Sequence, residues 1–324
     1  MKDQLGRTID YMRISVTDRC NLRCVYCMPA GGIRKIPHGD VLTFEEICRV
    51  AAAAALIGIE KIKITGGEPL VRKNIAELIR GVKQLEGIKK VTLTTNGLLF
   101  SEMAEQLAEA GLDAVNFSLD TLDADRYEAI TRARALDKVL DAVDLAVRMG
   151  LPAKINCVPM KNHNLGDLTG LAGLAKERPL SVRFIEMMPI GLGRNFETVG
   201  SEFVLRRIAA AFGEPVASAR AVGNGPALYY EFPGFKGSVG FISAMTGEFC
   251  GACNRVRLTS DGRLMPCLCN QKSLDLKSDL RNGLPQTELS GKMASFIAAK
   301  PRRHNLSEPK GNGAEEKHMV QIGG

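Results

Sequence analysis

The alternation of short β-rich runs with amphipathic helical stretches, from residue 11 to about residue 190, constrains the fold of this chain more than any other feature. Such alternation is typical of successive βα units with a parallel sheet. About six units favour a partial (βα)6 TIM-type barrel, although a doubly wound open sheet has the same periodicity. The predicted strands are Tyr11–Val16, Lys61–Thr65, Val91–Thr95, Ala114–Leu119, Ala153–Val158 and Val182–Glu186.

Helix boundaries can be read between these strands. Thr43 and Glu46 have the spacing of a capping box, and the alanine-rich stretch that follows them stops at Gly58. Two further helices are predicted for 101–111 and 137–149, where apolar residues recur at helical spacing and a glycine ends the pattern.

Residue types suited to chemistry follow several of the predicted strands. Cys20 comes after the first strand, Gly66-Gly67-Glu68-Pro69 after the second, and Thr94-Thr95-Asn96 and Ser118 end the third and fourth. Both candidate folds bind ligands at the carboxyl ends of their strands. We therefore expect these motifs to share one mouth.

The character of the sequence changes after about residue 220. The runs 229–232 and 238–242 predict antiparallel strands, and the residues from 300 on are rich in glycine, proline and charge. We divide the chain into a barrel (1–219), a β-rich C-terminal segment (220–299) and an extended tail (300–324).

Bulk composition predicts an ordinary soluble protein. With 324 residues, of which 45% are hydrophobic, the chain can bury a large core without disulfides. Met1–Arg7 has no apolar run, and Val50–Ile59 is too short to span a bilayer, so we expect a cytoplasmic protein without membrane contact. The formal charge is +7, but no basic run with interleaved aromatic residues predicts binding to nucleic acid.

The nine cysteines are grouped. In a chain without an export signal, clustered cysteines are more often metal ligands or catalytic groups than disulfides. Cys48 and Cys157 stand alone in apolar segments, where core packing is the simplest interpretation.

The first group is Cys20, Cys24 and Cys27, close enough for one compact metal centre. A structural zinc site normally has a fourth ligand, for which His38 is the nearest histidine, whereas three cysteines leave one iron of a four-iron cluster open. The C-x3-C-x2-C spacing, with Tyr26 before the last cysteine, resembles the signature of the radical S-adenosylmethionine superfamily. The resemblance implies a [4Fe–4S] cluster whose open iron binds S-adenosylmethionine and helps to release a 5′-deoxyadenosyl radical.

The segment 66–69 resembles the GGEP motif of this superfamily, which contacts the amino group of the cofactor. Alone it would be a weak glycine-rich turn. After the cysteine motif it becomes a strong signal.

The second group is a C-x2-C pair at 250–253, followed by Cys267 and Cys269. On spacing alone a zinc ribbon with Cys269 as fourth ligand is the simplest interpretation. Beside the pair, however, Arg255 and Arg257 alternate on an extended segment, so that both project to one face, where they would suit a polyphosphate.

Nearly the whole chain resembles one family of the superfamily, the GTP 3′,8-cyclases that begin molybdenum-cofactor biosynthesis. The similarity includes Leu5-Gly6-Arg7, Arg13–Cys20, Phe184–Pro189 and the terminal Gly323-Gly324. It implies a lyase that converts GTP to (8S)-3′,8-cyclo-7,8-dihydro-GTP, in which the radical takes hydrogen from C3′ and the ribose radical attacks C8. It also implies a radical SAM fold whose C-terminal segment closes the barrel and carries a second [4Fe–4S] cluster that binds guanine.

The resemblance assigns binding roles but no catalytic side chain, because the cofactors carry the chemistry. The implied cluster ligands are Cys20, Cys24 and Cys27, and Cys250, Cys253 and Cys267. The implied S-adenosylmethionine residues are Tyr26, Gly67, Ser118 and Met188. The implied GTP residues are Arg13, Lys63, Thr94, Lys154, Arg255 and Arg257.

Three expectations complete this assignment. Cys269 lies outside the family pattern and is interpreted as a free thiol near the cluster. The Gly-Gly end resembles a tail that reaches toward the active site, with a disordered end as the alternative. The expected partners are an electron donor and the next pathway enzyme, cyclic pyranopterin monophosphate synthase, with the chain itself as a monomer or homodimer.

Two other functions remain open from the residues. A peptide-modifying radical enzyme also pairs C-x3-C-x2-C with C-terminal cysteines, but it would carry a larger cysteine-rich domain and would not need the paired arginines. A zinc-stabilised binding module would contain zinc, whereas two four-iron clusters would give about eight irons.

Overall fold

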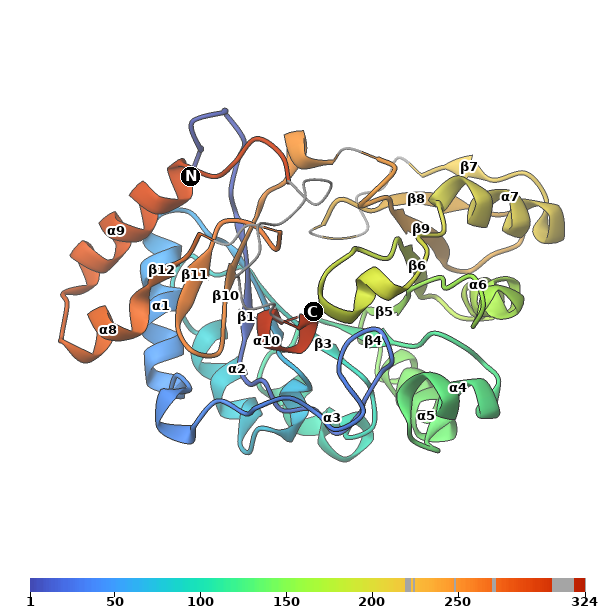
Figure 1. Ribbon diagram of the computed structural model, residues 1–324, viewed down its shortest axis with the longest axis horizontal. Coiled ribbons are helices and arrows are strands. Elements are labelled where there is room, and N and C mark those ends of the chain that lie inside the picture. The colour runs from blue at the N-terminus through green and yellow to red at the C-terminus, as the bar shows by residue number, and fades with distance from the viewer. Residues whose placement is uncertain (219–222, 224, 248, 270–271, 305–317, 324) are drawn as a thin grey trace.

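The computed structural model describes residues 1–218, 223, 225–247, 249–269, 272–304 and 318–323. One twelve-stranded sheet forms the frame of the molecule, and β1 to β6 lie at its centre, parallel and in chain order (Figure 1). Their bounds are β1 (Tyr11–Ser15), β2 (Lys61–Thr65), β3 (Lys90–Thr95), β4 (Ala114–Ser118), β5 (Ala153–Cys157) and β6 (Ser181–Ile185). The six predicted strands are confirmed, each to within one residue at either end.

Helices cover the outer side of the curved sheet (Figure 1). Those that follow β1 to β6 are α1 (Phe44–Leu56), α2 (Ile75–Lys83), α3 (Phe100–Glu109), α4 (Ala124–Thr131), α5 (Leu136–Arg148), α6 (Leu168–Glu177) and α7 (Ser201–Phe212). The predicted capping box is confirmed: Thr43 Oγ1 accepts from Glu46 N (3.2 Å), and Glu46 Oε2 accepts from Thr43 N (2.8 Å). This satisfies two N–H groups at the start of α1.

The C-terminal segment extends the sheet at both edges. Beyond β6 lie β9 (Ser238–Ile242), β8 (Leu228–Glu231) and β7 (Val216–Ala217), and beyond β1 lie β10 (Arg255–Leu258), β11 (Arg263–Met265) and β12 (Leu274–Asp275). The antiparallel pairing of β8 with β9 is confirmed, whereas β9 and β10 pair in parallel with β6 and β1.

The barrel remains partial, because no pairing of β12 with β7 is present among the described residues. The connection from β9 to β10, which carries Cys250 and Cys253, joins the strand that flanks β6 to the strand that flanks β1. The two sides of the parallel core are thus linked by a loop, and the described residues show no strand pairing that closes the barrel.

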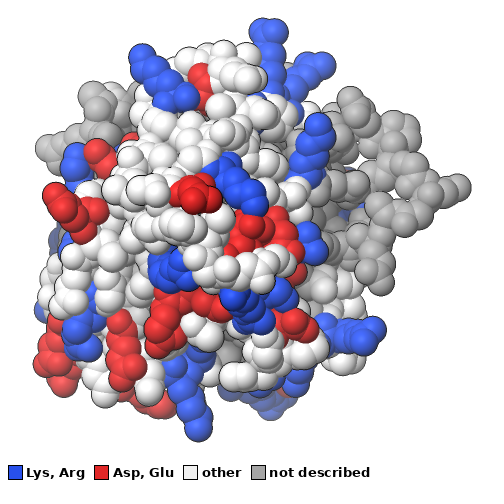
Figure 2. Space-filling view, turned by 90° about the vertical axis from the view of Figure 1, so that its left-hand side faces the viewer, with Lys and Arg blue, Asp and Glu red and all other residues white. Residues whose placement is uncertain are grey.

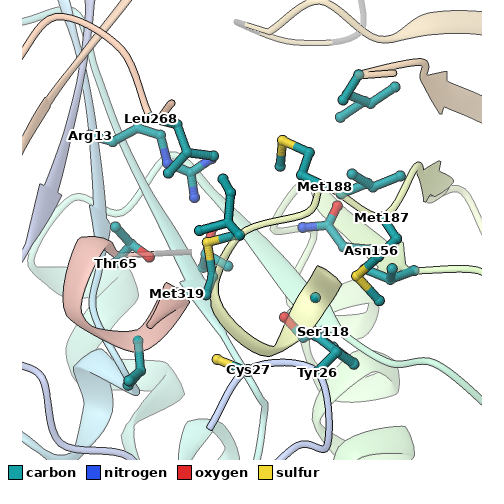
Figure 3. A pocket seen from close by; sticks show the side chains of 18 of the residues that line it. Arg13, Tyr26, Cys27, Thr65, Ser118, Asn156, Met187, Met188, Leu268 and Met319 are labelled. Atoms are coloured by element: carbon teal, nitrogen blue, oxygen red, sulfur yellow. The ribbon is translucent and has the colours of Figure 1, made fainter. Parts of the chain in front are cut away.

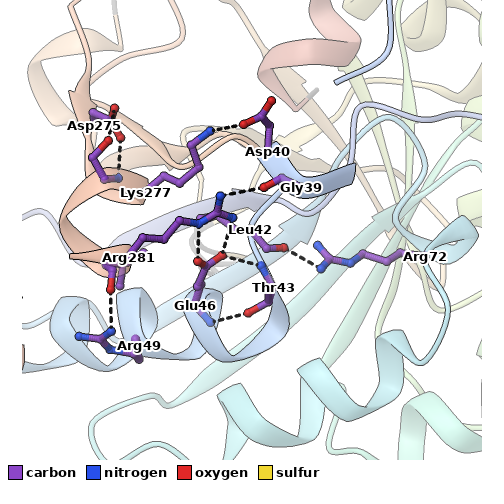
Figure 4. Close-up of polar contacts among 12 residues, drawn as sticks. Gly39, Asp40, Leu42, Thr43, Glu46, Arg49, Arg72, Asp275, Lys277 and Arg281 are labelled. Atoms are coloured by element: carbon purple, nitrogen blue, oxygen red, sulfur yellow. Dashed lines mark hydrogen bonds and ion pairs between the residues drawn. The ribbon is translucent and has the colours of Figure 1, made fainter. Parts of the chain in front are cut away.

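The helices α8 (Leu276–Arg281) and α9 (Gln286–Ala298) pack against α1 and attach the C-terminal segment to it (Figure 4). The short α10 (Met319–Ile322) follows near the end of the chain. Arg281 Nε pairs with Glu46 Oε1 (2.8 Å), and Lys277 Nζ pairs with Asp40 Oδ1 (2.9 Å). Arg49 of α1 donates to the carbonyl oxygens of Leu280 (3.2 Å) and Leu284 (2.8 Å).

The face formed by α1, α8 and α9 carries interspersed positive and negative side chains (Figure 2). A mixed surface of this kind creates no extended field of one sign. Among the described residues, no helix has both the length and the apolar character that a membrane span requires.

Candidate functional site

Both cysteine groups line one cavity of about 290 Å³ at the carboxyl ends of the parallel strands. In Figure 3, Tyr26, Cys27 and Ser118 lie at one end of this cavity, and Arg13 and Leu268 lie at the other. The prediction that the motifs share one mouth is confirmed. The cysteines that line the cavity are Cys20, Cys24, Cys27, Cys250, Cys253, Cys267 and Cys269.

The first cysteine loop is held against the glycine pair that follows β2. Gly67 N donates to the carbonyl oxygen of Thr17 (2.7 Å), and Glu68 N donates to that of Arg19 (2.8 Å). A Cβ atom at Gly67 would collide with the Arg19 carbonyl and lie 2.8 Å from Val320 Cγ2. Only glycine therefore allows the two loops to approach this closely.

The buried carboxylate of Glu68 fixes the neighbouring strand end. It accepts hydrogen bonds from Leu70 N (3.0 Å), Thr95 Oγ1 (2.8 Å) and Asn96 N (2.7 Å). Asn96 Nδ2 in turn donates to Asn21 Oδ1 in the cysteine loop (2.7 Å). Burial raises the pKa of Glu68 to about 7. The ends of β2 and β3 and the cysteine loop thus form one connected unit.

The three thiols of this loop fit an iron–sulfur cluster. Burial raises the pKa of Cys20, of Cys24 and of Cys27, the last to about 12, and the thiolates also repel one another. Three thiolates at this place need a positive charge between them, which iron ions supply. No three His, Cys, Asp or Glu side chains of the described residues converge on a single ion. A four-iron cluster does not require such convergence, because each thiolate binds a different iron.

Asp120 completes this end of the cavity. Its Oδ2 accepts from the hydroxyl of Tyr26 (2.7 Å) and its Oδ1 from Val158 N (2.8 Å). Burial raises the pKa of Asp120 to about 6. The carboxylate orients the Tyr26 ring beside the cysteines.

Two buried cations position the second cysteine group. Arg7 Nη1 donates to the carbonyl oxygen of Cys250 (3.0 Å), and Nη2 donates to that of Lys300 (2.9 Å). Its Nε pairs with Asp3 Oδ2 (2.6 Å), where both side chains are almost fully buried. The N-terminal turn therefore holds the loop that carries Cys250.

Lys300 supports the backbone near Cys253 and Cys267. Its Nζ donates to the carbonyl oxygens of Arg255 (2.7 Å) and Pro266, which lie close in sequence to Cys253 and directly before Cys267. Although burial acts in the opposite direction, Arg255 and Lys300 hold the pKa of Cys253 below its usual value. The cations thus fix the backbone and favour the thiolate form.

Cys267 and Cys269 are distinguished by a hydrogen bond. The side chain and the main-chain N–H of Cys269 donate to Cys267 Sγ, the N–H at 3.5 Å, and lower the pKa of Cys267 to about 5 despite burial. The same contact raises the pKa of Cys269. This backbone donor favours the ionised form of Cys267.

We expect Arg7→Met to destabilise the second cysteine group selectively. The change removes the donors to the Cys250 and Lys300 carbonyls and leaves Asp3 buried without its cation, a loss of about 3–5 kcal/mol. Iron per chain after a chelator challenge, together with thermal unfolding, measures the effect. The matched control is Arg49→Met, which removes carbonyl contacts far from both cysteine groups. If both variants lose iron equally, Arg7 has no specific role in positioning.

A line of basic residues crosses the interior of the barrel. The strand register places Arg257 of β10 beside Arg13 of β1, and Arg13 beside Lys63 of β2. Burial lowers the pKa of Arg257 to about 9, helped by repulsion from Arg13 and Arg255. Cations held together in this way are stabilised when an anion binds among them.

Further cations lie beneath the lining of the cavity. Burial lowers the pKa of Lys63 well below its usual value, with repulsion from Arg183 as the next cause, and that of Lys154 to about 8. With its amide oxygen turned toward them, Asn116 accepts hydrogen bonds from Lys63 and from Arg183 Nη2 (3.1 Å). The described ion pairs contain no carboxylate partner for Lys63, Lys154 or Arg183. This end of the site therefore suits a multiply charged anion.

Most of the predicted binding residues meet in the cavity. Those that line it are Tyr26, Gly67, Ser118, Met188, Arg13, Thr94, Arg255 and Arg257. Lys63 and Lys154 are not part of the lining, but lie close to Arg183 in the interior. Sequence reasoning missed several polar residues of the site, namely Asp120, Asn156, Arg183, Lys300 and His304. Arg183 had a signal, since a charge within a strand that is otherwise buried needs a reason.

The end of the chain also reaches the site. Met319 and Val320 line the cavity, and the carbonyl oxygen of Gly323 accepts from Arg257 Nη1 (2.5 Å). A Cβ atom at Gly323, where φ is +80°, would lie 2.8 Å from Ser15 Cβ. The prediction of an extended tail is thus wrong at Met319–Ile322, which form the helical turn α10 docked at the cavity. Residues 305–317 and 324 lie outside the described part of the chain.

Comparisons with known proteins agree with this geometry. The family model described as Radical SAM superfamily matches residues 14–175, and the one described as Molybdenum Cofactor Synthesis C matches residues 180–306. The chain is 47% identical to a GTP 3′,8-cyclase of Pelotomaculum thermopropionicum over 100% of both chains. It is 45% identical to one of Geobacter sulfurreducens over 99% of both chains.

Solved structures share the fold. SuiB of Streptococcus suis, solved bound to S-adenosylmethionine, is 19% identical, with a TM-score of 0.61 over 89% of this chain and 68% of that chain. A second structure of SuiB gives the same TM-score at 18% identity, with the same coverage. At this identity the likeness concerns the fold alone.

Proposed function

This chain belongs to the radical SAM superfamily and, within it, to the GTP 3′,8-cyclases. From this membership we propose which part of the cavity binds S-adenosylmethionine and which part binds GTP. The enzyme converts GTP to (8S)-3′,8-cyclo-7,8-dihydro-GTP, the first step of molybdenum-cofactor biosynthesis, using S-adenosylmethionine and a [4Fe–4S] cluster. The observation that carries the proposal is that one cavity is lined by both cysteine groups and by Arg13, Arg255 and Arg257, with Lys63 buried beneath the lining.

Cys20, Cys24 and Cys27 hold the cluster at the first end. S-adenosylmethionine bound there supplies a 5′-deoxyadenosyl radical, which begins the reaction. Gly67 gives the cofactor close access to the backbone, and Tyr26, Ser118 and Met188 line the part of the cavity that binds it. These assignments are supported by the common position of the four residues around the first cysteine group.

Cys250, Cys253 and Cys267 hold a second [4Fe–4S] cluster, which binds the guanine. Support comes from the backbone N–H of Cys269, which donates to Cys267 Sγ, and from the carbonyl contacts of Arg7 and Lys300. Cys269 then remains a thiol that donates to Cys267.

The buried cations bind and orient the triphosphate. Arg13, Arg255 and Arg257 contact it from the cavity wall, Thr94 lies at the end of β3, and Lys63 and Lys154 add charge from beneath. Fixing the phosphates holds the ribose still while the short-lived radical acts. The expected partners of the enzyme are an electron donor and the next pathway enzyme, which would receive the product.

We expect Lys63→Met to weaken GTP use without affecting the radical source. Removing a buried charge that would pair with a bound phosphate costs about 2 kcal/mol or more, equal to about a thirtyfold rise in KM. The measurement is anaerobic product formation against GTP concentration, with 5′-deoxyadenosine followed in parallel. The control is Lys61→Met on the same strand, which loses only a partly exposed pair with Asp10. An unchanged KM in Lys63→Met would remove this lysine from the GTP site.

A further inference from the structure

A second cavity, of about 170 Å³, lies behind the first cysteine loop. Cys20 lines this outer cavity as well as the large one, and it is common to both linings among the described residues. The outer cavity therefore reaches the first cysteine group at Cys20. Arg19, Arg23 and Lys35 also line the outer cavity.

The segment around this cavity is strongly basic. From Arg19 to Gly39 the sequence contains no Asp or Glu. Arg19, Arg34 and Lys35 are exposed, and Arg23 is partly exposed. Arg23 Nη1 donates to the carbonyl oxygen of Cys20 (2.8 Å), so its guanidinium lies directly on the cysteine loop.

An exposed residue from a third part of the chain joins this segment. Arg132, which ends α4 in a left-handed conformation (φ 61°), donates to the carbonyl oxygens of Arg23 (2.5 Å) and Met28 (3.4 Å). We call Arg19, Arg23, Arg34, Lys35 and Arg132 the outer basic surface.

The positive charge of the outer basic surface is not neutralised within the described part of the chain. None of its five residues takes part in a described ion pair. Asp18 lines the outer cavity, but it is 1% exposed and its Oδ2 accepts from Ile36 N (2.7 Å). Uncompensated exposed cations over a cavity attract a partner with a negative surface.

We propose that the outer basic surface docks a small acidic protein that carries a one-electron redox centre, and that its electron enters the first cluster at Cys20. The inference rests on the proposed placement of that cluster on Cys20, Cys24 and Cys27. The carrier is oxidised by one electron, the cluster is reduced by one, and no proton or atom is exchanged.

The arrangement of the two cavities explains why electrons enter from this side. The large cavity is the proposed site of S-adenosylmethionine and GTP, and the chain end also enters it. On the outer side, the loop that carries Cys20 lies between a docked carrier and the cluster. Opposite charges would also speed the encounter and fix its orientation, with a strong dependence on ionic strength.

The test compares two reductants. The full chain with reconstituted clusters is reduced by dithionite or by a flavodoxin with its NADPH-dependent reductase, and 5′-deoxyadenosine is measured. The double variant Arg34→Glu/Lys35→Glu alters the outer basic surface without changing any residue of the large cavity. We expect flavodoxin-driven formation and flavodoxin affinity, measured by calorimetry, to fall about tenfold or more at low salt. Dithionite-driven formation stays at the wild-type level.

The control is Lys138→Glu/Arg148→Glu on the exposed side of α5, which makes the same change in net charge elsewhere. The proposal is overturned if Arg34→Glu/Lys35→Glu leaves flavodoxin affinity unchanged, or if the control variant loses as much flavodoxin affinity. Binding of wild-type protein to anionic phosphatidylserine vesicles in place of flavodoxin would also overturn it.

Two further outcomes separate the proposals from each other. Failure of wild-type protein to form 5′-deoxyadenosine with dithionite would contradict the function and not the docking surface. If the Glu variant loses dithionite activity, the neutral double variant Arg34→Gln/Lys35→Gln is tested instead, and only its flavodoxin affinity is compared with wild type. An unchanged flavodoxin affinity in that variant refutes docking on the outer basic surface.

Discussion

Cys27→Ser is expected to abolish 5′-deoxyadenosine formation. The thiol lies at the end of the cavity with Tyr26 and Ser118, and burial raises its pKa to about 12, so only a bound metal centre makes its ionised form favourable there. Serine replaces a soft thiolate by a hard hydroxyl that binds iron–sulfur clusters poorly. The measurements are iron content and anaerobic 5′-deoxyadenosine with dithionite as reductant, so that docking of an electron carrier plays no part.

The matched control is Cys48→Ser. Cys48 is a half-buried thiol of α1 outside the cavity, close to Gly81. It should retain both the iron and the activity. Wild-type amounts of 5′-deoxyadenosine from Cys27→Ser would refute the assignment of the first cluster.

Cys267→Ser and Cys269→Ser are expected to differ sharply, although the two cysteines are two residues apart. Loss of the Cys267 thiolate removes a ligand of the second cluster, so about four of about eight irons are lost. GTP conversion then stops, while the first cluster still forms 5′-deoxyadenosine. Cys269→Ser should keep both clusters, because a serine hydroxyl can also donate a hydrogen bond to Cys267 Sγ.

Iron and sulfide analysis, the EPR signals of the reduced clusters and product formation measure this difference. The opposite pattern, with iron lost only in Cys269→Ser, would make Cys269 the third ligand. Zinc in place of iron in the wild-type protein would refute the second cluster altogether.

The strands and the first cysteine group were predictable for local reasons. Alternating apolar runs, the Thr43 capping box and terminal glycines are short-range signals, and C-x3-C-x2-C is contained within one loop. The orientation of the C-terminal segment was not predictable in this way. No short-range sequence pattern predicts that β9 pairs in parallel with β6 or β10 with β1, because each pairing joins residues far apart in the chain.

The support of the second cysteine group shows the same limit. The sequence identifies Arg7 as part of a family resemblance, but nothing near it predicts a contact with the carbonyl of Cys250. Lys300 is read as the start of a polar tail, yet it is a buried cation beside two cysteines. Such roles depend on burial and on distances across the fold, which composition does not encode.

The sequence by itself determined the βα scaffold, the family and the residue types at the two cysteine groups, because periodicity, turn chemistry and ligand spacing are local properties. The tertiary structure decided which of these groups face one another. It aligned Arg257, Arg13 and Lys63 through strand register, and it placed Val320 and Gly323 in the mouth of the barrel. It also placed Cys20 in the lining of both cavities, a position that depends on packing.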